Sequence, residues 1–364
     1  MGSLRLGDNE KMIVSSPGRI CLFGEHQDYL GLPVIAAAIS LRVTIEGQTR
    51  RDMTVNVDLP DVGGKETFSM EGDLTYTKAA DYFKSGINTL RKDGFTFSNG
   101  CDCVVNGNIP VQAGTSSSSA MVVSWINFLS AMSDQVVDLE PRVLADLAYR
   151  SEVKEFDEAG GMMDHYTSAV GGVVYIASEP EMVVEKLPCW LGSFVLGDSL
   201  EKKDTQAVLS RSKERVIDLV AKVQAENRDF SLHTATVNEV AEIESLSEEE
   251  MALLTKTLLN RDITSEGMDL LQKKEVAGAR LGDLLNRQHV ILRDSLGVST
   301  DKIETMLEAA IAAGAYGGKI NGSGGGGCMF AYAPNAADNV ATAIEEAGGK
   351  SYIVHVDKGS VKDG

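Results

Sequence analysis

The sequence predicts a mixed α/β (α+β) fold built from two units, and three observations support this prediction. Residues 12 to about 110 contain short β-branched or alternating segments between turn residues, which is typical of strands. Helical patterns dominate from residue 117 onward and alternate with further apolar strand-like segments. The chain has 364 residues, which is enough for two units with sizeable cores. We therefore predict an N-terminal unit over residues 1–190 and a C-terminal unit over residues 191–364.

The elements of these units can be assigned in chain order. The early strands are expected in the segments VTIEG, MTVNVDL and CDCVVNG. Ser247 and Glu250 have the spacing of a capping box, which predicts that a helix begins after Ser247. The later strands are expected at 171–178, at 193–199 and in CMFAYAP and SYIVHVD. The periodic segments predict helices over 117–132, 142–158, 163–170, 205–226, 268–295, 303–315 and 336–347.

Charge and cysteine content limit the class of partner. The net charge of −19 argues against a nucleic acid or an acidic membrane surface as partner, because both would be repelled. The chain has five cysteines, and an odd number in a long chain is typical of reduced thiols inside the cell. The N-terminus lacks the apolar stretch of a signal peptide, and no run of about 18 apolar residues is present. We expect a cytoplasmic protein that binds a small molecule, and the sequence does not indicate its oligomeric state.

The segment GTSSSSAM begins an apolar helix with four consecutive serines, Ser116 to Ser119. One serine is enough to cap a helix, so the others suggest that a ligand is held there. Glycine lets the backbone approach a ligand, and the free N–H groups of a first helical turn bind phosphate oxygens. The G-x-x-x-x-G-K-[ST] pattern is absent, so this is not a Walker-type loop. A serine-rich helix cap is the structural alternative.

The segment GRICLFGEHQDYLG places Glu25, His26 and Asp28 together just after an apolar strand. A solvated turn would explain these charges. However, apolar sequence on both sides indicates that the turn lies at the rim of a core. Carboxylates and an imidazole in such a position are suited to binding the hydroxyls of a polyol.

Two further segments contain candidate functional residues. The segment GGKINGSGGGGC (317–328) lies between an Ala-rich helix and an apolar strand, which favours a close-packed turn near a site over a flexible linker. In YRSEVKEFDEAGGMMDHYTSAVGG (149–172), Asp164 follows Gly160-Gly161 among apolar neighbours. It would act as a helix cap or, if buried beside a cation, as the acceptor for a substrate hydroxyl.

Together these segments resemble the GHMP small-molecule kinases over nearly the whole chain. The first segment is most similar to galactokinase, and LFGEH and KINGSGGGGC are equally similar to mevalonate kinase. Cys21, Thr115 and His165 depart from the galactokinase pattern, which bears on the substrate more than on the chemistry. The resemblance implies an N-terminal ribosomal-S5-like domain, which binds ATP, and a C-terminal ferredoxin-like domain, with the active site between them.

The resemblance also implies roles for individual residues. Asp164 would be the catalytic base or orienting acceptor and Arg19 the basic residue beside it, while Ser118 and Glu152 would bind Mg²⁺. The residues implied in sugar binding are Glu25, His26, Asp28 and Tyr29. The ATP phosphate loop would comprise Gly114, Thr115, Ser116, Ser117, Ser118 and Ser119. The third motif would comprise Gly322, Gly324, Gly325, Gly326 and Gly327.

These roles predict an enzyme that transfers the γ-phosphate of ATP to the anomeric hydroxyl of galactose or a close relative. A kinase for a heptose, an amino or uronic sugar, or mevalonate is the alternative within the family. Asp28 and Tyr29 favour a sugar, because the resemblance implies an apolar neighbourhood there in mevalonate kinases. A non-catalytic sensor of sugar and ATP is a different class, but each catalytic position holds a chemically competent residue.

Overall fold

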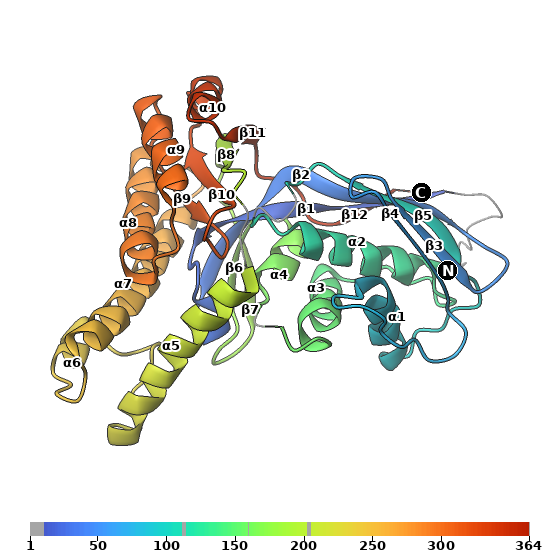
Figure 1. Cartoon of the computed structure of the whole chain (residues 1–364), viewed down its shortest axis with the longest axis horizontal. Helices are drawn as coiled ribbons and strands as arrows, with labels where there is room; N and C mark the ends of the chain where they lie inside the picture. Colours follow the sequence, from blue (N-terminus) through green and yellow to red (C-terminus); the bar gives the residue numbers. More distant parts are fainter. Residues whose placement is uncertain (1–10, 111–113, 159, 202–204, 364) are drawn as a thin grey trace.

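The computed structural model describes residues 11–110, 114–158, 160–201 and 205–363. Figure 1 shows an elongated molecule, with a large twisted sheet towards one end and a smaller sheet with long helices towards the other. The mixed α/β prediction is confirmed. The large sheet has the order β12-β1-β2-β5-β3-β4, and β6 and β7 extend it from β2. Its strands are β1 (Met12–Phe23), β2 (Val34–Thr49), β3 (Thr54–Leu59), β4 (Gly64–Ser69), β5 (Cys101–Gly107), β6 (Val173–Ala177), β7 (Val183–Leu187) and β12 (Val361–Asp363).

Four helices and a π-helical turn accompany the large sheet in the N-terminal unit. They are α1 (Tyr82–Lys92), α2 (Ser117–Met132), α3 (Pro141–Tyr149), α4 (Met163–Val170) and the turn η2 (Arg150–Lys154). The central helix α2 is buried along most of its length, and its Trp125 and Phe128 stack in the main core. Figure 1 shows α2 lying along the sheet, so its first turn is fixed close to the middle of the molecule. Packing therefore holds the serine run in place.

The second sheet is antiparallel, with the order β11-β8-β10-β9. Its strands are β8 (Phe194–Asp198), β9 (Gly317–Asn321), β10 (Cys328–Tyr332) and β11 (Lys350–Val354). Val195, Met329, Ile303 and Ile344 belong to one core that this sheet shares with its helices. The helices of this half are α5 (Thr205–Glu226), α6 (Val237–Ala241), α7 (Glu248–Leu271), α8 (Gly278–Leu296), α9 (Asp301–Ala312) and α10 (Ala337–Glu346).

The chain passes between the two sheets twice. It leaves the large sheet after β7 and enters the second sheet at β8, on either side of the predicted boundary at residue 190. After β11 it returns, and β12 pairs with β1 through Val14 and Lys362. The C-terminal segment thereby ties the second unit back to the strand that carries Arg19. The domain limits themselves stay a prediction.

Most predicted helices match the structure, but several segments differ. The expected helix 142–158 is shorter: α3 ends at Tyr149, the π-helical turn η2 follows to Lys154, and a turn comes next. The expected helix 268–295 is wrong: α7 ends at Leu271 and α8 begins at Gly278, because the intervening backbone pairs with Trp190. Within the expected strand-rich region, the structure contains helix α1. Its internal Gly86 weakens the helical signal, yet a Cβ at Gly86 would lie 2.7 Å from the Trp125 ring. In the third glycine segment, residues 317–321 form strand β9, and the turn begins at Gly322.

Candidate active site

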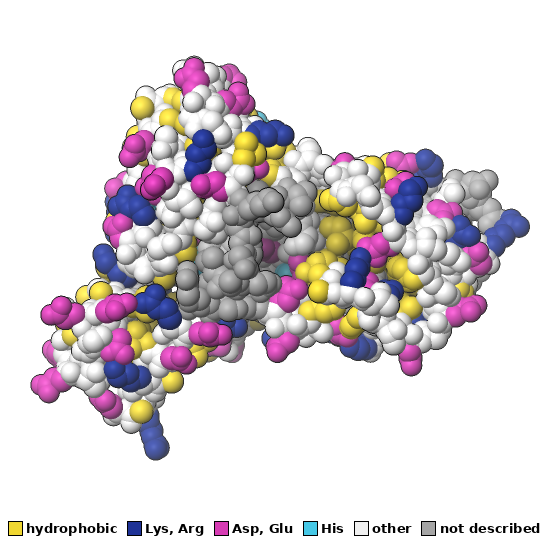
Figure 2. All heavy atoms as spheres, in the orientation of Figure 1, with side chains coloured by type: hydrophobic (Ala, Val, Ile, Leu, Met, Phe, Trp, Pro, Cys, Tyr) yellow, Lys and Arg dark blue, Asp and Glu magenta, His cyan; other side chains and the backbone are white. Residues whose placement is uncertain are grey.

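A cleft of about 730 Å³ contains most of the residues that the sequence singled out. Figure 2 shows a hollow near the middle of the molecule with hydrophobic side chains on its wall. The N-terminal unit supplies nearly all of the lining, and Gly322 and Ser323 come from the C-terminal unit. The cleft has three parts, which are the serine run, a polar part and an apolar wall.

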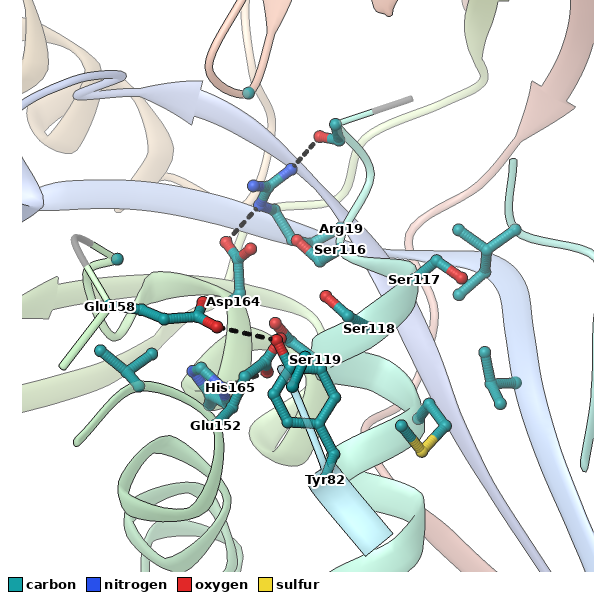
Figure 3. A pocket seen from close by; sticks show the side chains of 18 of the residues that line it. Arg19, Tyr82, Ser116, Ser117, Ser118, Ser119, Glu152, Glu158, Asp164 and His165 are labelled. Carbon is teal, nitrogen blue, oxygen red and sulfur yellow. Dashed lines mark hydrogen bonds and ion pairs between the residues drawn. The ribbon is translucent and has the colours of Figure 1, made fainter. Parts of the chain in front are cut away.

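The serine run forms the N-terminus of α2 (Figure 3). Ser116 is the N-cap residue, in the left-handed region at φ 61°, and its side chain makes no capping hydrogen bond. The alternative of a serine-rich cap is therefore not supported for Ser116. The first N–H groups of an α-helix have no partner within the helix, so those of Ser117, Ser118 and Ser119 are available to a ligand. All four serines line the cleft, which suits an anion held by backbone amides.

The third glycine segment packs directly on the loop before this helix. Gly114 has φ 84° and Gly322 has φ 79°, a region that favours glycine. A Cβ at Gly322 would lie 2.8 Å from the Gly114 carbonyl oxygen. The Asn321 side-chain amide donates to the same oxygen at 2.8 Å. The close-packed turn predicted from the sequence thus supports the loop that precedes the serines.

Arg19 and Asp164 form an ion pair beside the serine run, in which Arg19 is buried and Asp164 is partly exposed. Arg19 Nε donates to Asp164 Oδ1 at 2.7 Å, and Arg19 Nη1 donates to the Gly114 carbonyl at 2.5 Å. Asp164 lies in the first turn of α4, but the N-cap residue is Met162, so Asp164 does not cap this helix. Burial alone would raise the pKa of Asp164. The adjacent Arg19 charge and the Ser116 hydroxyl outweigh burial and lower that pKa, so the carboxylate is ionised at neutral pH.

The turn after β1 carries the polar residues of the first motif. His26 has φ 61°, and its ring nitrogens lie 3.0 Å from the Tyr29 hydroxyl and 3.0 Å from the Ser323 carbonyl oxygen. Glu25 accepts from the fully buried Lys319 at 2.7 Å. Glu25, His26, Asp28 and Tyr29 all line the cleft. One Glu25 oxygen is thus occupied within the protein, while His26 and Tyr29 orient each other.

Asp28 lies against the glycine pair that precedes α4. A Cβ at Gly161 would be 1.8 Å from Asp28 Oδ2, so only glycine leaves room for this carboxylate. Burial, followed by the nearby Asp164 charge, raises the pKa of Asp28 to about 6. The structure therefore brings two carboxylates and one guanidinium into the polar part of the cleft.

Glu152 and Ser118 line the cleft close to Arg19 and Asp164 (Figure 3). Glu152 belongs to the π-helical turn η2, and its Oε2 lies 2.7 Å from Nε2 of the buried His165. This contact occupies one Glu152 oxygen and leaves Oε1 for another ligand. A carboxylate oxygen and the exposed Ser118 hydroxyl are hard oxygen donors, which fit Mg²⁺ when phosphates supply the remaining ligands. Within the described ranges, no cluster of three His, Cys, Asp or Glu forms a self-contained metal site.

Sequence reasoning missed the apolar part of the cleft. Its wall includes Val43 of β2, Leu59 of β3, Val105 of β5, Ile109 and Met121 of α2. These residues occur in ordinary strand and helix patterns, so no sequence signal separates them from core residues. Lys319 and Asn321 were also missed, since the glycines around them dominate the motif.

A helix terminus with free N–H groups, an Arg–Asp ion pair and a cleft rich in oxygen donors are features that suit a small-molecule phosphotransferase. Three family models match the chain: the GHMP kinases N terminal domain over residues 77–172, the GHMP kinases C terminal over 274–350, and the galactokinase galactose-binding signature over 5–49. The chain belongs to the GHMP kinase family, and the resemblance stated from the sequence is confirmed.

Similar proteins include mevalonate kinases and galactokinases. The chain is 30% identical over 363 residues to mevalonate kinase from Pyrococcus furiosus, covering 97% of this chain and 98% of that one. It is 29% identical over 360 residues to galactokinase from Levilactobacillus brevis, covering 93% and 88%. The crystal structure of Lactococcus lactis galactokinase complexed with galactose aligns with a TM-score of 0.82 at 22% identity, covering 97% and 95%. Methanococcus jannaschii mevalonate kinase aligns at 0.73 and 19%, covering 97% and 100%. These structural matches show the shared fold.

Within the described part of the chain, no helix is long and apolar enough to cross a membrane.

Proposed function

We propose that this protein is an ATP-dependent sugar kinase that phosphorylates the anomeric hydroxyl of galactose or a closely related neutral sugar. The observation that carries the proposal is the position of Asp28, whose carboxylate faces Gly161 in the same cleft as Arg19 and Asp164. A carboxylate in this position accepts hydrogen bonds from sugar hydroxyls. The match to the galactose-binding signature over residues 5–49 includes this turn and supports the same substrate class.

Charge distinguishes a neutral sugar from mevalonate, which is an anion. Among the described residues that line the cleft, Arg19 and Lys78 carry the Lys and Arg charges. Arg19 pairs with Asp164, and Lys78 pairs with Glu66. The second cation near the turn, Lys319, is held by Glu25. Among these described residues, a substrate carboxylate would therefore meet Asp28 without an uncommitted cation to neutralise it, and burying such a charge is costly.

The remaining parts of the cleft suit Mg·ATP. The apolar wall would receive the base, and the first-turn amides of α2 would hold the phosphates. Ser118 and Glu152 would hold Mg²⁺, which offsets phosphate charge when bound. Arg19 would stabilise the transferring phosphate, and the ionised Asp164 would accept a hydrogen bond from the attacking hydroxyl.

Mevalonate is a second candidate substrate, because the identity to the Pyrococcus furiosus mevalonate kinase extends over nearly the whole chain. A sensor without turnover is disfavoured, since Arg19, Asp164, Ser118 and Glu152 are all present in the cleft. We also propose a cytoplasmic location, because the cysteines are free thiols, as is typical of a reducing compartment.

An ADP-release screen over hexoses, heptoses, uronic acids and mevalonate tests the proposal. We expect a neutral hexose of the galactose type to give the highest kcat/KM, and the product should carry an acid-labile anomeric phosphate. Preferential turnover of mevalonate would refute the sugar assignment and leave the kinase class intact.

A further inference from the structure

Two buried polar side chains behind the cleft belong to strand β9. Lys319 and Asn321 are two residues apart, so they point to the same side of the strand. Both have 0% exposure, although they carry an ammonium and an amide. Neither residue lines the cleft, so neither is placed to touch a substrate. Buried groups of this kind need partners, and their partners lie in the other unit of the protein.

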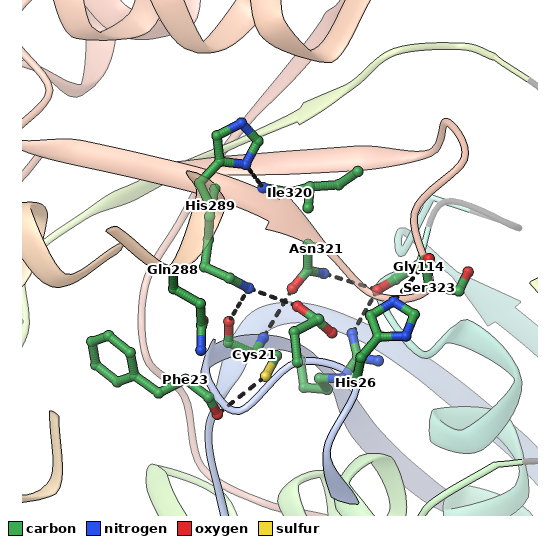
Figure 4. Close-up of polar contacts among 12 residues, drawn as sticks. Cys21, Phe23, His26, Gly114, Gln288, His289, Ile320, Asn321 and Ser323 are labelled. Carbon is green, nitrogen blue, oxygen red and sulfur yellow. Dashed lines mark hydrogen bonds and ion pairs between the residues drawn. The ribbon is translucent and has the colours of Figure 1, made fainter. Parts of the chain in front are cut away.

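Both side chains bind the backbone of the same β1 residue, Cys21. Figure 4 shows Cys21 and Asn321 at this contact. Lys319 Nζ donates to the Cys21 carbonyl at 2.9 Å, and the Cys21 N–H donates to Asn321 Oδ1 at 2.9 Å. Cys21 lies where the pairing of β1 with β2 shifts register before Phe23. It also lies two residues after Arg19 and four before Glu25. The position of Cys21 therefore affects both the catalytic arginine and the substrate turn.

Each side chain also reaches a second partner, and these partners differ. Lys319 Nζ donates to Glu25 Oε2 at 2.7 Å, at the beginning of the substrate turn. Asn321 Nδ2 donates to the Gly114 carbonyl at 2.8 Å, which also accepts from Arg19 at 2.5 Å. Because a peptide unit is planar, fixing the Gly114 carbonyl also fixes the plane that carries the Thr115 N–H. Asn321 thus orients the entry to the serine run.

We propose that Lys319 and Asn321, together the β9 clamp, are positioning residues with separate targets. Asn321 positions the phosphate loop and Arg19 for Mg·ATP, and Lys319 positions the substrate turn through Glu25. This inference rests on the proposed function, because it takes the serine run as the phosphate site. A purely structural clamp would hold the two units together, and its loss would weaken both ligand sites to the same extent.

The test uses variants that remove one end of the clamp at a time. N321D keeps an oxygen to accept from the Cys21 N–H but loses the donor to Gly114. The double variant E25Q/K319M removes the Lys319–Glu25 pair without leaving an unpaired buried charge. N286D and K302M are the matched controls. Asn286 accepts from the Gly318 N–H of β9, a contact that aspartate retains, and Lys302 donates to the Ala347 carbonyl away from the cleft.

The decisive measurement is calorimetric binding of Mg·ADP to the whole protein, after a thermal melt has verified folding. We expect N321D to weaken Mg·ADP binding by about 10-fold or more, as for a lost buried hydrogen bond. E25Q/K319M and both controls should stay within about 2-fold. E25Q/K319M should instead raise the KM of the sugar that the wild type phosphorylates. N321A replaces N321D if the aspartate variant does not fold.

Equal weakening of Mg·ADP binding by N321D and E25Q/K319M would overturn the proposal, as would binding within 2-fold for N321D. The Mg·ADP measurement does not depend on the identity of the sugar. A wild type that turns over no sugar would therefore refute the proposed function, while the response of N321D would still decide the role of Asn321.

Discussion

Asp164→Asn changes one charge at the centre of the proposed mechanism and little else. The substitution preserves the size and shape of the side chain, and the amide oxygen can still accept the Arg19 Nε–H, which now lies 2.7 Å from Asp164 Oδ1. Asp164 is not the N-cap of α4, and losing its charge in the first helical turn would cost the helix only about 0.3–1 kcal/mol. A role limited to starting α4 would therefore leave turnover near normal. A role as acceptor for the attacking hydroxyl would not.

The expected size of the effect follows from the surroundings of Asp164. Losing the base or orienting acceptor should lower kcat by at least about 10²-fold, which corresponds to about 2.7 kcal/mol in the barrier. Breaking a buried ion pair costs about 3–5 kcal/mol when one charge is left without a partner. Here Arg19 keeps the amide oxygen and the Gly114 carbonyl, so we expect a smaller loss of stability, about 1–3 kcal/mol.

The pH dependence of this loss can be predicted from the direction of the pKa shift. The pKa of Asp164 is lowered in the folded protein, so its contribution to stability is present above the unfolded value near pH 4. That contribution is lost as the pH falls through the folded pKa. The difference in the free energy of unfolding between wild type and D164N should therefore be largest at neutral pH and shrink below about pH 4.

Single-turnover phosphorylation at saturating Mg·ATP measures the chemical step, and calorimetry with Mg·ADP and sugar checks binding. Asp93→Asn is a matched control, because Asp93 pairs with Arg150 at a partly exposed site that does not line the cleft. D93N should leave kcat unchanged. A D164N protein with near wild-type turnover and an unchanged melting temperature would remove Asp164 from the mechanism and leave Arg19 without its proposed partner.

Three further predictions concern the serine run, the substrate turn and the third glycine segment. Ser118→Ala should lower Mg·ATP turnover by about 10-fold or more, while Ser116→Ala is milder because backbone amides act there; equal small effects in steady-state kinetics would contradict the Mg²⁺ assignment. The folded pKa of Asp28, about 6, lies above its unfolded value, so its favourable contribution is complete below about pH 4 and is lost as the pH rises through 6. At pH 8, Asp28→Asn should therefore have a free energy of unfolding up to about 3 kcal/mol larger than wild type and a higher melting temperature. This advantage should disappear near pH 4, and the variant should bind sugar more weakly. A lower melting temperature at pH 8 would contradict this prediction. Gly322→Ala should weaken Mg·ADP binding in calorimetry, because its Cβ would press on Gly114 O at 2.8 Å; unchanged affinity would show that the loop can yield.

The sequence predicts which residues meet in the cleft better than it predicts how they are held. Ser116–Ser119 and the GEHQDY turn are recognisable because polar residues interrupt apolar segments, and these interruptions are local. Lys319 and Asn321 are recognisable only after folding, because their partners Glu25 and Gly114 lie 294 and 207 residues away in the chain. Contacts of this range leave no periodic pattern.

The fold was predictable to a similar degree. Helices α2 and α4 match their expected ranges because each begins after a break in the apolar pattern and ends at one. The gap between α7 and α8 was not predictable, because the residues in it are compatible with a helix. The backbone pairing with Trp190 breaks the helix there, and this is a tertiary contact. Local propensity is overridden here by an isolated backbone bridge.

The net charge of −19 poses a problem for a protein that binds a polyanion such as ATP. Among the described residues that line the cleft, the Lys and Arg side chains do not solve it, because Arg19 is paired with Asp164 and Lys78 with Glu66. In the proposed mode of binding, the attraction would come mainly from the first-turn amides of α2, which carry positive partial charges, and from the metal that accompanies the nucleotide. Fixed backbone dipoles attract an anion only when their N–H groups point at it. An acidic protein therefore depends on the packing that sets the direction of these N–H groups. In this proposal, the contacts of Asn321 and Gly322 with Gly114 orient the backbone N–H groups of the loop. These oriented groups would bind the anion in place of the charged side chains that other anion sites use.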